Sequence, residues 1–589
     1  MIYSKLSTRV FSHGVTVVGP PLSHTTRRRA TNTFSIGGAS WSSWYPSHSF
    51  VRPLRHLSWC RVKAAGDTCN ATTQRPADVG AAIVVGAIFS GVIILATSQS
   101  AFADAPSPDE KLIRLHEIHD HNRRADAFWV YRGNRVYDIT DWVPNHPGGE
   151  VIMRAVGGSI EPYWNIFAIH QKQDVYDVLE QYFIGIIDPR DLVDGQAPAD
   201  QVDDPFKSDP VRDKELIVHS TRPFNAETAA TDLQTFITPT SRFYKRHHLW
   251  VPQVDEETFT LTVELADGEE KAYSVADLRK RFKEHTITAT MQCSGNRRSH
   301  MTEGSSPTNG IQWGVGAISN ASWTGVRMLD VLEDAGFNAT SPPEDVNHVQ
   351  FLGAEAYGAS VPLQKVMDRF GDVMIVYAMN GKPLSRDHGY PLRALVPGTV
   401  AARSVKWLNR IILSEEESSS QWQQRDYKCF GPNEGSKPDW ESAVAIQETP
   451  VQSAITDVQK VTTNRLRDSS LARVYGLEEE SIILRGYAFS GAGRPIVRVD
   501  ISPDNGKTWQ QAQIEDAKEQ GQRSWSWRLW SLAVPTRLLS GNVCVKATDD
   551  GYNTQPESFT PYYNFRGNLA NSWHRVPTSE VLSAAAVPK

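Results

Sequence analysis

The chain has 589 residues, which is too long for one hydrophobic core and predicts roughly three to five domains. Its formal net charge of −6 is unremarkable for a soluble protein and gives no reason to expect a nucleic-acid partner. Its five cysteines form neither a CxxC pair nor a zinc-type spacing, so neither a disulfide framework nor a zinc site is predicted.

Residues 1–66 have the composition of a mitochondrial transit peptide, because they contain no Asp or Glu but nine Lys and Arg residues among many Ser and Thr. Residues 79–103 then carry no charge, include the apolar run 81–96 and are long enough to span a bilayer. We therefore predict that residues 1–103 are a two-part signal whose removal releases the remainder into the intermembrane space, without a lasting membrane anchor. The alternative is a retained anchor, and the N-terminus of the mature protein distinguishes the two.

Residues 128–138 predict two short strands around a turn at Gly133 and Asn134. The sequence His146-Pro-Gly-Gly follows and opens a helical pattern, in which the glycines allow close approach of the backbone. A second histidine, His170, lies 24 residues later in an aromatic segment. Two histidines on opposite sides of a flat apolar cavity are what a six-coordinate haem requires. The alternative is a helix-start turn and a surface histidine.

In order, Trp129, the VYDIT strand, HPGG, EPYW and His170 resemble cytochrome b5, in the form that is fused to sulfite oxidases. The resemblance implies a small α+β haem domain over residues 109–188, with His146 and His170 as axial ligands of a b-type haem. Residues 104–213 contain 21 acidic and 11 basic residues. This excess would steer a basic electron-transfer partner, although a generic solvated surface has the same composition.

Residues 189–214 are rich in proline and aspartate and predict a flexible acidic linker. A packed domain is expected over residues 215–446. Its pattern predicts strands at 259–264 and 286–291 and helices at 275–282 and 326–335, the first helix with a capping box from Ser274 and Asp277. Strands and helices mix without a regular βαβ repeat, so a mixed α+β fold is predicted for this domain.

Cys293 ends the second of these strands, and Arg297 and Arg298 follow it after a Ser-Gly turn. Neighbouring guanidinium groups favour a thiolate, which is a soft ligand for a transition metal. The same arginines could hold an oxyanion through paired hydrogen bonds. A lone cysteine after a strand is otherwise a small core residue, but adjacent arginines are poor core material.

Similar polar clusters recur at residues 246–248, 386–393, 403–406 and 426–428. Each cluster alone is better explained as solvated surface. Together with the stretch around Cys293, they predict a pocket that is built for anions, namely a phosphate-bearing cofactor and an oxyanion substrate.

The motifs QCSGNRRS, GVRMLDVL, RDHGYPLR, VKWL and RDYK, in this order, resemble the molybdopterin domain of sulfite oxidases and assimilatory nitrate reductases. With the b5-like domain in front, the chain is most similar to the mitochondrial sulfite oxidases of animals. The resemblance implies a molybdenum–molybdopterin cofactor with Cys293 as the thiolate ligand of the metal. It also implies a sulfite pocket formed by Arg246, Arg298, Trp313 and Tyr427. The pterin and its phosphate would be held by His248, His388, Arg393, Ser404 and Lys406.

Three departures from the family pattern limit this transfer. His247 stands where the family usually has Asn, so its role is not assigned. The loop between Arg298 and Trp313 lacks the usual basic residues, with Asn309 near an expected lysine. The segment FLGAEAYGAS is short, so the acidic pterin-binding residue of the family is not assigned either.

Residues 447–585 predict an Ig-like antiparallel β-sandwich of about seven strands. Strands are expected at 481–487, 496–501, 524–529 and 542–547, with a hairpin turn at Asp504-Asn-Gly. The resemblance makes this the dimerisation domain of a homodimer, and it implies that Arg566 returns to the substrate pocket.

The activity implied by the resemblance is oxidation of sulfite to sulfate by oxo transfer at molybdenum, with electrons passing singly through the haem to cytochrome c. Nitrate reduction is the nearest alternative, but no flavin or dinucleotide-binding domain follows the sandwich and the haem module comes first. A second alternative is a haem carrier with a metal-free scaffold. Metal analysis separates these, because iron without molybdenum would favour the carrier.

Overall fold

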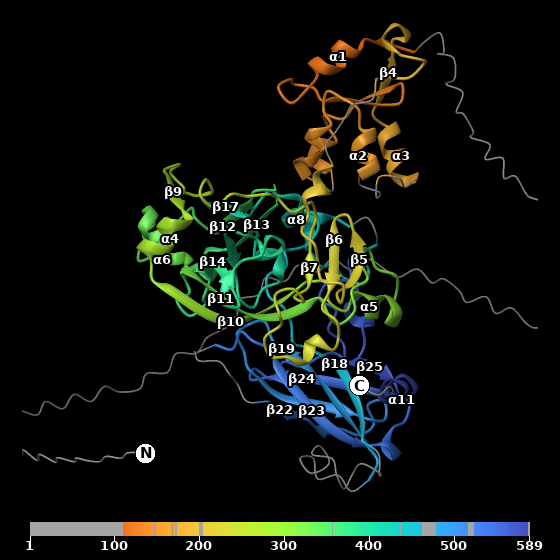
Figure 1. Ribbon diagram of the computed structural model, residues 1–589, viewed down its shortest axis with the longest axis vertical. Helices are drawn as coiled ribbons and strands as arrows, with labels where there is room; N and C mark the ends of the chain where they lie inside the picture. Colours follow the sequence, from red (N-terminus) through yellow and green to blue (C-terminus); the bar gives the residue numbers. More distant parts are fainter. Residues whose placement is uncertain are drawn as a thin grey trace, which may run out of the picture. The chain divides into compact units, whose positions relative to one another are not determined.

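The computed structural model describes residues 110–146, 149–166, 170, 173–198, 204–355, 357–435, 438–461, 479–515 and 523–586. The predicted transit segment and the apolar run 81–96 lie outside these residues. Within the described ranges, no helix has the length and apolar character needed to cross a bilayer. Helices and strands are mixed, so the predicted α+β class is confirmed (Figure 1).

The N-terminal part of the described chain contains a four-stranded sheet in the order β1-β4-β3-β2. The predicted hairpin is confirmed, and Gly133 makes its turn with a positive φ of 54° that glycine adopts easily. The helical pattern after His146 forms a 3-10 helix, Gly149–Arg154. The other elements are β1 (Leu112–Ile113), α1 (Leu115–Asp120), β2 (Trp129–Arg132), β3 (Arg135–Asp138), α2 (Glu161–Ile166), α3 (Gln173–Glu180) and β4 (Phe183–Ile187).

The first central sheet has the order β10-β11-β14-β15, with β16 paired to β14. Its longest pairing joins β10 to β11 in antiparallel register, and Cys293 follows the last residue of β10. This confirms a strand directly before the cysteine. The sheet comprises β10 (Glu284–Gln292), β11 (Ile318–Arg327), β14 (Met374–Met379), β15 (Lys382–Pro383) and β16 (Arg393–Leu395).

A second central sheet has the order β13-β12-β17-β8-β9, in which only β17 and β8 run parallel. A small third sheet joins β5, β6 and β7, and β7 carries Arg246. The strands are β5 (Ile217–Thr221), β6 (Phe224–Glu227), β7 (Lys245–Arg246), β8 (Thr260–Glu264), β9 (Glu270–Ser274), β12 (His348–Gly353), β13 (Gly358–Pro362) and β17 (Leu408–Ser414).

Both predicted helices of this region form. In α4 the Ser274 hydroxyl and the Asp277 carboxylate make the expected capping box. The helix α6 buries one face, which includes Met328 and Val331, as its apolar spacing requires. The helices are α4 (Val275–Arg281), α5 (Arg298–Gly304), α6 (Met328–Ala335), α7 (Leu363–Met367) and α8 (Gln421–Gln424).

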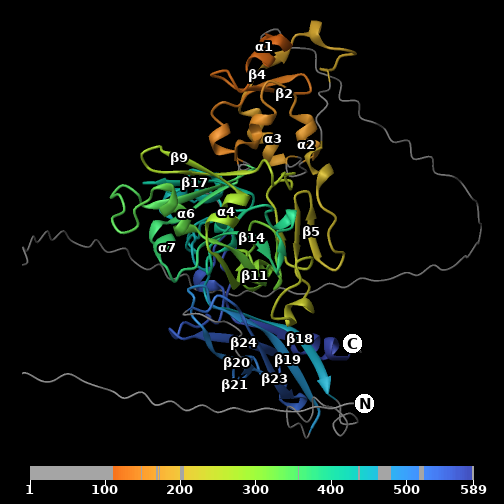
Figure 2. The same ribbon diagram turned by 60° about the vertical axis from the view of Figure 1, so that its left-hand side comes forward.

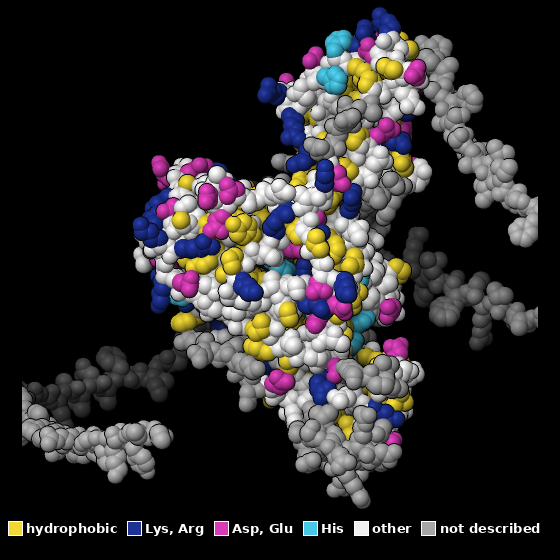
Figure 3. Space-filling model, in the orientation of Figure 1, with side chains coloured by type: hydrophobic (Ala, Val, Ile, Leu, Met, Phe, Trp, Pro, Cys, Tyr) yellow, Lys and Arg dark blue, Asp and Glu magenta, His cyan; other side chains and the backbone are white. Residues whose placement is uncertain are grey.

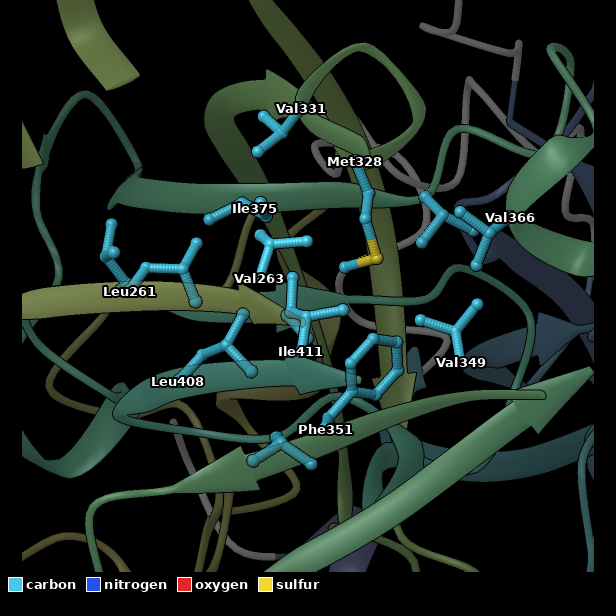
Figure 4. Packing of buried hydrophobic residues seen from close by; sticks show 14 of the residues in the cluster. Leu261, Val263, Met328, Val331, Val349, Phe351, Val366, Ile375, Leu408 and Ile411 are labelled. Atoms are coloured by element: carbon cyan, nitrogen blue, oxygen red, sulfur yellow. The ribbon is translucent and has the colours of Figure 1, made fainter. Parts of the chain in front are cut away.

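The main core lies between the second sheet, β14 and the helices α6 and α7. Figure 4 shows Leu261, Val263, Phe351 and Ile411 directing their side chains toward one another, with Met328 above them. These five side chains are fully buried. Each contributes about 1.5–3 kcal/mol through removal of apolar surface from water. This core supports the strands and loops that carry the polar residues described below.

The C-terminal part is a sandwich of two four-stranded sheets, in the orders β18-β19-β23-β22 and β21-β20-β24-β25 (Figure 2). The predicted sandwich is therefore confirmed, with eight described strands against about seven expected. The prediction of a strand at 524–529 is wrong in its start, because β23 begins at Arg528. The elements are β18 (Gln452–Val461), β19 (Ser481–Phe489), β20 (Ile496–Ser502), β21 (Gln510–Gln511), β22 (Gln513–Ile514), β23 (Arg528–Pro535), β24 (Asn542–Asp549), β25 (His574–Pro577) and α11 (Thr578–Ala586).

Candidate functional site

A cavity with about 710 Å³ of empty space, its open mouth included, lies in the central part of the chain. Its walls come from β7 and the residues after it, from the end of β10, and from the loops around β16. Cys293, Arg246 and Tyr427 line it. All five residues predicted to hold the cofactor also line it, namely His248, His388, Arg393, Ser404 and Lys406.

The backbone brings the cofactor-binding candidates together. Arg393 in β16 and Lys406 are opposite one another in an isolated antiparallel bridge. Gly389 allows the chain just before β16 to pass close to Lys406, because a Cβ there would lie 3.0 Å from the Lys406 Cβ at a φ of 105°. The Ser404 hydroxyl accepts the Val396 amide at 3.0 Å, which fixes the loop between them.

The cavity is rich in positive charge. It is lined by Lys245, Arg246, Arg393 and Lys406, whereas Glu355 and Asp387 are its carboxylates. Burial lowers the pKa of Lys245 to about 8, of Arg393 to about 10 and of Lys406 to about 7. The lowered pKa values mean that the carboxylates of the protein do not fully offset the cost of burying these positive charges.

Three buried polar atoms of cavity-lining residues have no hydrogen-bond partner in the described part of the chain. They are Arg393 Nε, Glu355 Oε2 and His247 Nε2. Buried polar atoms are nearly always paired in proteins, so unpaired ones in a cavity indicate a ligand. Such a ligand needs oxyanion groups for the cations and N–H groups for the carboxylate. A phosphate-bearing pterin has both, so the residues present fit the cofactor that the sequence predicted.

Cys293 is 5% exposed and lies at the edge of this cavity. Its amide donates to Ala317 O at 2.9 Å, and its carbonyl accepts from the Asn296 amide at 3.0 Å. These bonds hold the turn after β10. The thiol of Cys293 interacts electrostatically with Tyr244, Arg298 and Tyr427. The cysteine thus belongs to a buried cluster and also reaches the cavity, close to the guanidinium of Arg298.

Arg298 begins α5 and is buried, with an exposed fraction of 6%. Its guanidinium donates to three neutral acceptors: Arg566 O at 2.8 Å, Ile311 O at 2.8 Å and Asn568 Oδ1 at 3.1 Å. Gly295 makes room for it, since a Cβ there would lie 2.7 Å from the guanidinium carbon. Within the described residues these acceptors leave the buried charge of Arg298 without a carboxylate partner.

The structure also brings Arg566 and Arg246 into this region. Burial lowers the pKa of Arg566 to about 10, and the positive charges of Arg298 and Arg246 act in the same direction. Arg566 donates to the carboxylate of Asp426, and Arg246 donates to Asn225 Oδ1 at 3.2 Å. Three arginines from distant parts of the sequence therefore lie close enough for their charges to interact.

Tyr427 is held in the cavity wall by His248, whose Nε2 lies 3.0 Å from the tyrosine hydroxyl. Burial raises the pKa of Tyr427, and burial lowers the pKa of His248 well below its ordinary value. The pair therefore consists of a neutral phenol and a neutral imidazole joined by a hydrogen bond, and both pKa shifts oppose transfer of a proton from the tyrosine to the histidine. The His248 ring is itself fixed against Tyr357, with ring centroids 5.1 Å apart.

Trp313 lies behind this region and not in the cavity wall. It is 1% exposed, and its ring meets His219 edge-on with centroids 4.9 Å apart. Glu227 holds both sides of this arrangement, because its carboxylate contacts His219 at 2.6 Å and accepts the Gly314 amide at 2.8 Å. Arg298 and Arg566 likewise adjoin the cavity without forming its described wall.

Several residues in and around the cavity had no role in the sequence prediction. Glu355 of the short FLGAEAYGAS loop lines the cavity, and its position in that loop was a usable signal. Asp387 and His247 contact each other, which no local pattern indicated. Asn225 and Asn568 support two of the arginines and carry no sequence signal at all.

His146 and His170 lie together in the N-terminal part. Their ring centroids are 6.1 Å apart and their planes differ by 10°. A metal–imidazole bond of about 2 Å on each side of one ion fits this separation. Trp164 stacks on His170 with centroids 5.5 Å apart, within an apolar cluster that includes Val130 and Leu179. The arrangement fits a haem between the two imidazoles.

Comparison with known domain families matches these three parts in order. Residues 114–188 match the cytochrome b5-like heme/steroid binding domain, and residues 248–422 match the oxidoreductase molybdopterin binding domain. Residues 443–581 match the Mo-co oxidoreductase dimerisation domain.

Among individual proteins, the chain is 41% identical over 498 residues to a mitochondrial sulfite oxidase of Rattus norvegicus, covering 82% of this chain and 87% of the relative. It is 42% identical over 472 residues to a sulfite oxidase of Gallus gallus, covering 78% and 98%. A nitrate reductase of Phaseolus vulgaris is 32% identical over 377 residues, but that match covers 61% of this chain and 41% of the relative.

A b5-like domain joined to a molybdopterin-binding domain and a dimerisation domain defines a haem-containing molybdenum oxidoreductase. Its cofactors are molybdenum–molybdopterin and a b-type haem. The chain belongs to the sulfite oxidase family.

Proposed function

We propose that this chain oxidises sulfite to sulfate at a molybdenum centre and passes the electrons singly through its b-type haem. The observation that carries the proposal is the group of three arginines, Arg246, Arg298 and Arg566, beside the buried Cys293 at the edge of a cofactor cavity. Sulfite is a small oxyanion, and guanidinium groups bind such anions through paired, charge-assisted hydrogen bonds.

In this proposal Cys293 is the protein thiolate on molybdenum. His248, His388, Arg393, Ser404 and Lys406 hold the pterin and its phosphate, and Glu355 accepts hydrogen bonds from the N–H groups of the pterin. When bound, the cofactor supplies the oxo group that sulfite takes up and accepts the two electrons. The excess of cations in the cavity offsets the negative charge of the bound cofactor.

The arginines would hold the sulfite dianion and direct its sulfur lone pair toward the oxo group that the cofactor supplies, which is a positioning effect. Arg298 is fixed by three acceptors and therefore needs little reorganisation when the anion binds. Arg566 is paired with Asp426, so substrate competes with that carboxylate for one guanidinium. Tyr427 orients the substrate, and its hydroxyl is held by His248 through their 3.0 Å hydrogen bond.

The test is sulfite-dependent reduction of the haem, followed by its absorbance, together with metal analysis. We expect about one molybdenum and one haem iron per chain, and haem reduction that requires sulfite. Iron without molybdenum would support a haem carrier. Nitrate-dependent oxidation of the reduced haem at a rate exceeding sulfite oxidation would support the nitrate reductase alternative.

We further propose that the protein is a homodimer in mitochondria, that it resides in the intermembrane space, and that cytochrome c accepts its electrons. The dimerisation domain supports the first point. Relatives named mitochondrial and the transit-like composition of residues 1–66 support the location. A cytochrome b5-like domain with an acidic surface supports a basic electron acceptor.

The rate of cytochrome c reduction is expected to fall as ionic strength rises, because residues 110–188 contain 12 acidic and 8 basic residues. On the face drawn in Figure 3, Lys and Arg side chains are mixed with Asp and Glu over the described surface. We therefore expect a fall of about tenfold, and not more, between low and high salt. Stopped-flow measurements over a salt series check this, with sulfite-dependent haem reduction as the internal control. A salt-independent rate would contradict steering.

Cofactor binding by the cofactor-free protein is expected to weaken as pH rises through about 7. Burial lowers the pKa of Lys406 to about 7, and burial raises the pKa of Glu355 to about 8. As pH rises, Lys406 loses its positive charge and Glu355 gains a negative one, so both changes oppose a phosphate-bearing ligand. Arg393, Asp387 and Arg246 also act on Lys406. Cofactor uptake measured from about pH 6 to 9 checks this, and Lys406→Arg should flatten the part of the profile near pH 7 and leave the fall near pH 8 that Glu355 causes.

A further inference from the structure

His247 is a buried imidazole that lies between two charged groups of the cofactor cavity. It is 2% exposed and lines the cavity. Its Nε2 lies 3.2 Å from Asp387 Oδ1, and its Nδ1 lies 2.7 Å from Lys406 Nζ. The side chain thus connects a carboxylate on one side with an ammonium group on the other.

Both ends of this arrangement are fixed by other residues. Asp387 accepts from Arg212 Nη2 at 2.9 Å, so its carboxylate is already paired and oriented. The His247 amide donates to Asn225 Oδ1 at 3.0 Å, which holds the backbone. The imidazole lies over the ring of Trp407 with centroids 6.0 Å apart and planes 27° apart. The imidazole therefore has one well-defined orientation.

Lys406 depends on this histidine for its placement. Its Nζ donates to Arg246 O at 3.1 Å and to Asp387 O at 3.4 Å, while the contact with His247 Nδ1 is the shortest at 2.7 Å. An ammonium group only donates, so Nδ1 accepts from Lys406 and the ring proton is on Nε2. The approach of Nε2 to Asp387 does not have hydrogen-bond geometry, so the contact with Lys406 is the one that the neutral ring satisfies. Burial lowers the pKa of His247 to about 3.

We propose that His247 is a positioning residue for the cofactor, which acts by fixing the Lys406 ammonium group where an oxyanion of the bound cofactor meets it. The long contact with Asp387 O is the one that the oxyanion replaces, while the His247 contact stays and directs Nζ into the cavity. This proposal rests on the proposed function, because it takes the cavity as the site of the phosphate-bearing pterin.

Two amide substitutions separate the halves of the imidazole. Asn places its amide oxygen near the position of the histidine Nδ1, so His247→Asn keeps an acceptor for Lys406. Gln places its amide nitrogen near Nε2, so His247→Gln keeps a donor on the Asp387 side and loses the acceptor. If His247 acts through Lys406, only the Gln variant should lose the cofactor. The family resemblance, which expects Asn at this position, fits the same reasoning.

The experiment measures retention of the cofactor by the holoenzyme after prolonged dilution. Molybdenum is measured by mass spectrometry and pterin by the fluorescence of its oxidised form, so the readout does not depend on activity. We expect retention in His247→Asn close to the wild type and loss from His247→Gln roughly tenfold faster or more, since a hydrogen bond to a charged group is removed. Equal retention in both variants, or faster loss from the Asn variant, would overturn the proposal.

A matched control is His574→Asn, because His574 is a buried imidazole in β25 that accepts the Ile455 amide at 3.0 Å and lies outside the cavity wall. It should lower the melting temperature and leave cofactor retention unchanged. A cycle of His247→Gln and Lys406→Met completes the test. We expect the double variant to lose cofactor no faster than Lys406→Met alone, whereas additive effects would contradict action through Lys406. Absence of sulfite oxidation by the wild type would instead contradict the proposed function.

Discussion

Replacing Cys293 with serine is expected to abolish sulfite-dependent reduction of cytochrome c, by about a hundredfold or more, equivalent to roughly 3 kcal/mol in the barrier. A serine hydroxyl is a hard donor with a far higher pKa than a thiol, so it is a poor substitute for a thiolate on a soft metal. The haem spectrum should remain that of the wild type, because His146 and His170 belong to a different part of the chain. Steady-state assays and absorbance spectra of the two proteins check this.

The matched control is Cys429→Ser. Cys429 lies two residues after Tyr427 and is half-buried, and burial raises its pKa to about 12, so its thiol stays protonated and unreactive. This variant should retain most of the activity. Full activity in Cys293→Ser, with molybdenum content equal to the wild type, would contradict the assignment of Cys293 as the metal ligand.

Replacing Arg298 with glutamine is expected to lower kcat/KM for sulfite by about a hundredfold to a thousandfold. The guanidinium is buried beside Arg246 and Cys293 and has only neutral partners within the described residues, so its charge is available to an anion. Most of the loss should appear in KM, since the substrate loses an ion contact before reaction. Sulfite titrations of variant and wild type measure the separation between KM and kcat.

The neighbouring Arg297→Gln is the control, because Arg297 points away to the β-sandwich. Its guanidinium donates to Gln452 Oε1 at 2.7 Å and to Ser453 O at 3.3 Å. Its substitution should cost roughly 1–3 kcal/mol of stability, since buried acceptors lose their donor, and should leave KM for sulfite nearly unchanged. Thermal unfolding measures the first effect. A rise of KM equal to that of Arg298→Gln would show that the two arginines are not distinguished as the geometry indicates.

Local signals were sufficient for many elements of the fold. The capped helix α4 and the hairpin at Gly133 follow from capping residues and turn residues that act over three or four positions. The start of β23 was not predictable in this way. Trp525 and Trp527 alternate like strand residues, yet Trp525 O accepts the Thr290 amide at 2.9 Å and the Trp527 amide donates to Thr290 Oγ1 at 2.9 Å. This segment therefore bonds to the strand that leads to Cys293, before the chain joins the sandwich.

The candidate site was likewise predictable from the sequence only in part. The anion-binding clusters were recognisable in the sequence because each combines cations within a few residues. The carboxylate of Asp387 and the imidazole of His247 were visible as residue types, but their contact joins positions 140 residues apart and leaves no local pattern. The carbonyl of Arg566 accepts from Arg298 across 268 residues, and the Asn568 side chain is a second such acceptor.

By itself, the sequence determined the kinds of chemistry that this protein carries. A cysteine followed by arginines, two histidines near aromatic residues and repeated basic clusters indicate a reactive thiol, a haem and an anion pocket, and the family resemblance implies the molybdenum and haem ligands. Only the tertiary structure decided which of these groups meet, because contacts between distant segments depend on how the sheets pack and not on local preference. In the folded protein Arg298 lies beside Cys293, whereas the Arg297 guanidinium donates a hydrogen bond to Gln452 of the β-sandwich. The tertiary structure also placed His247 between Asp387 and Lys406, where a neutral imidazole can hold a lysine in position.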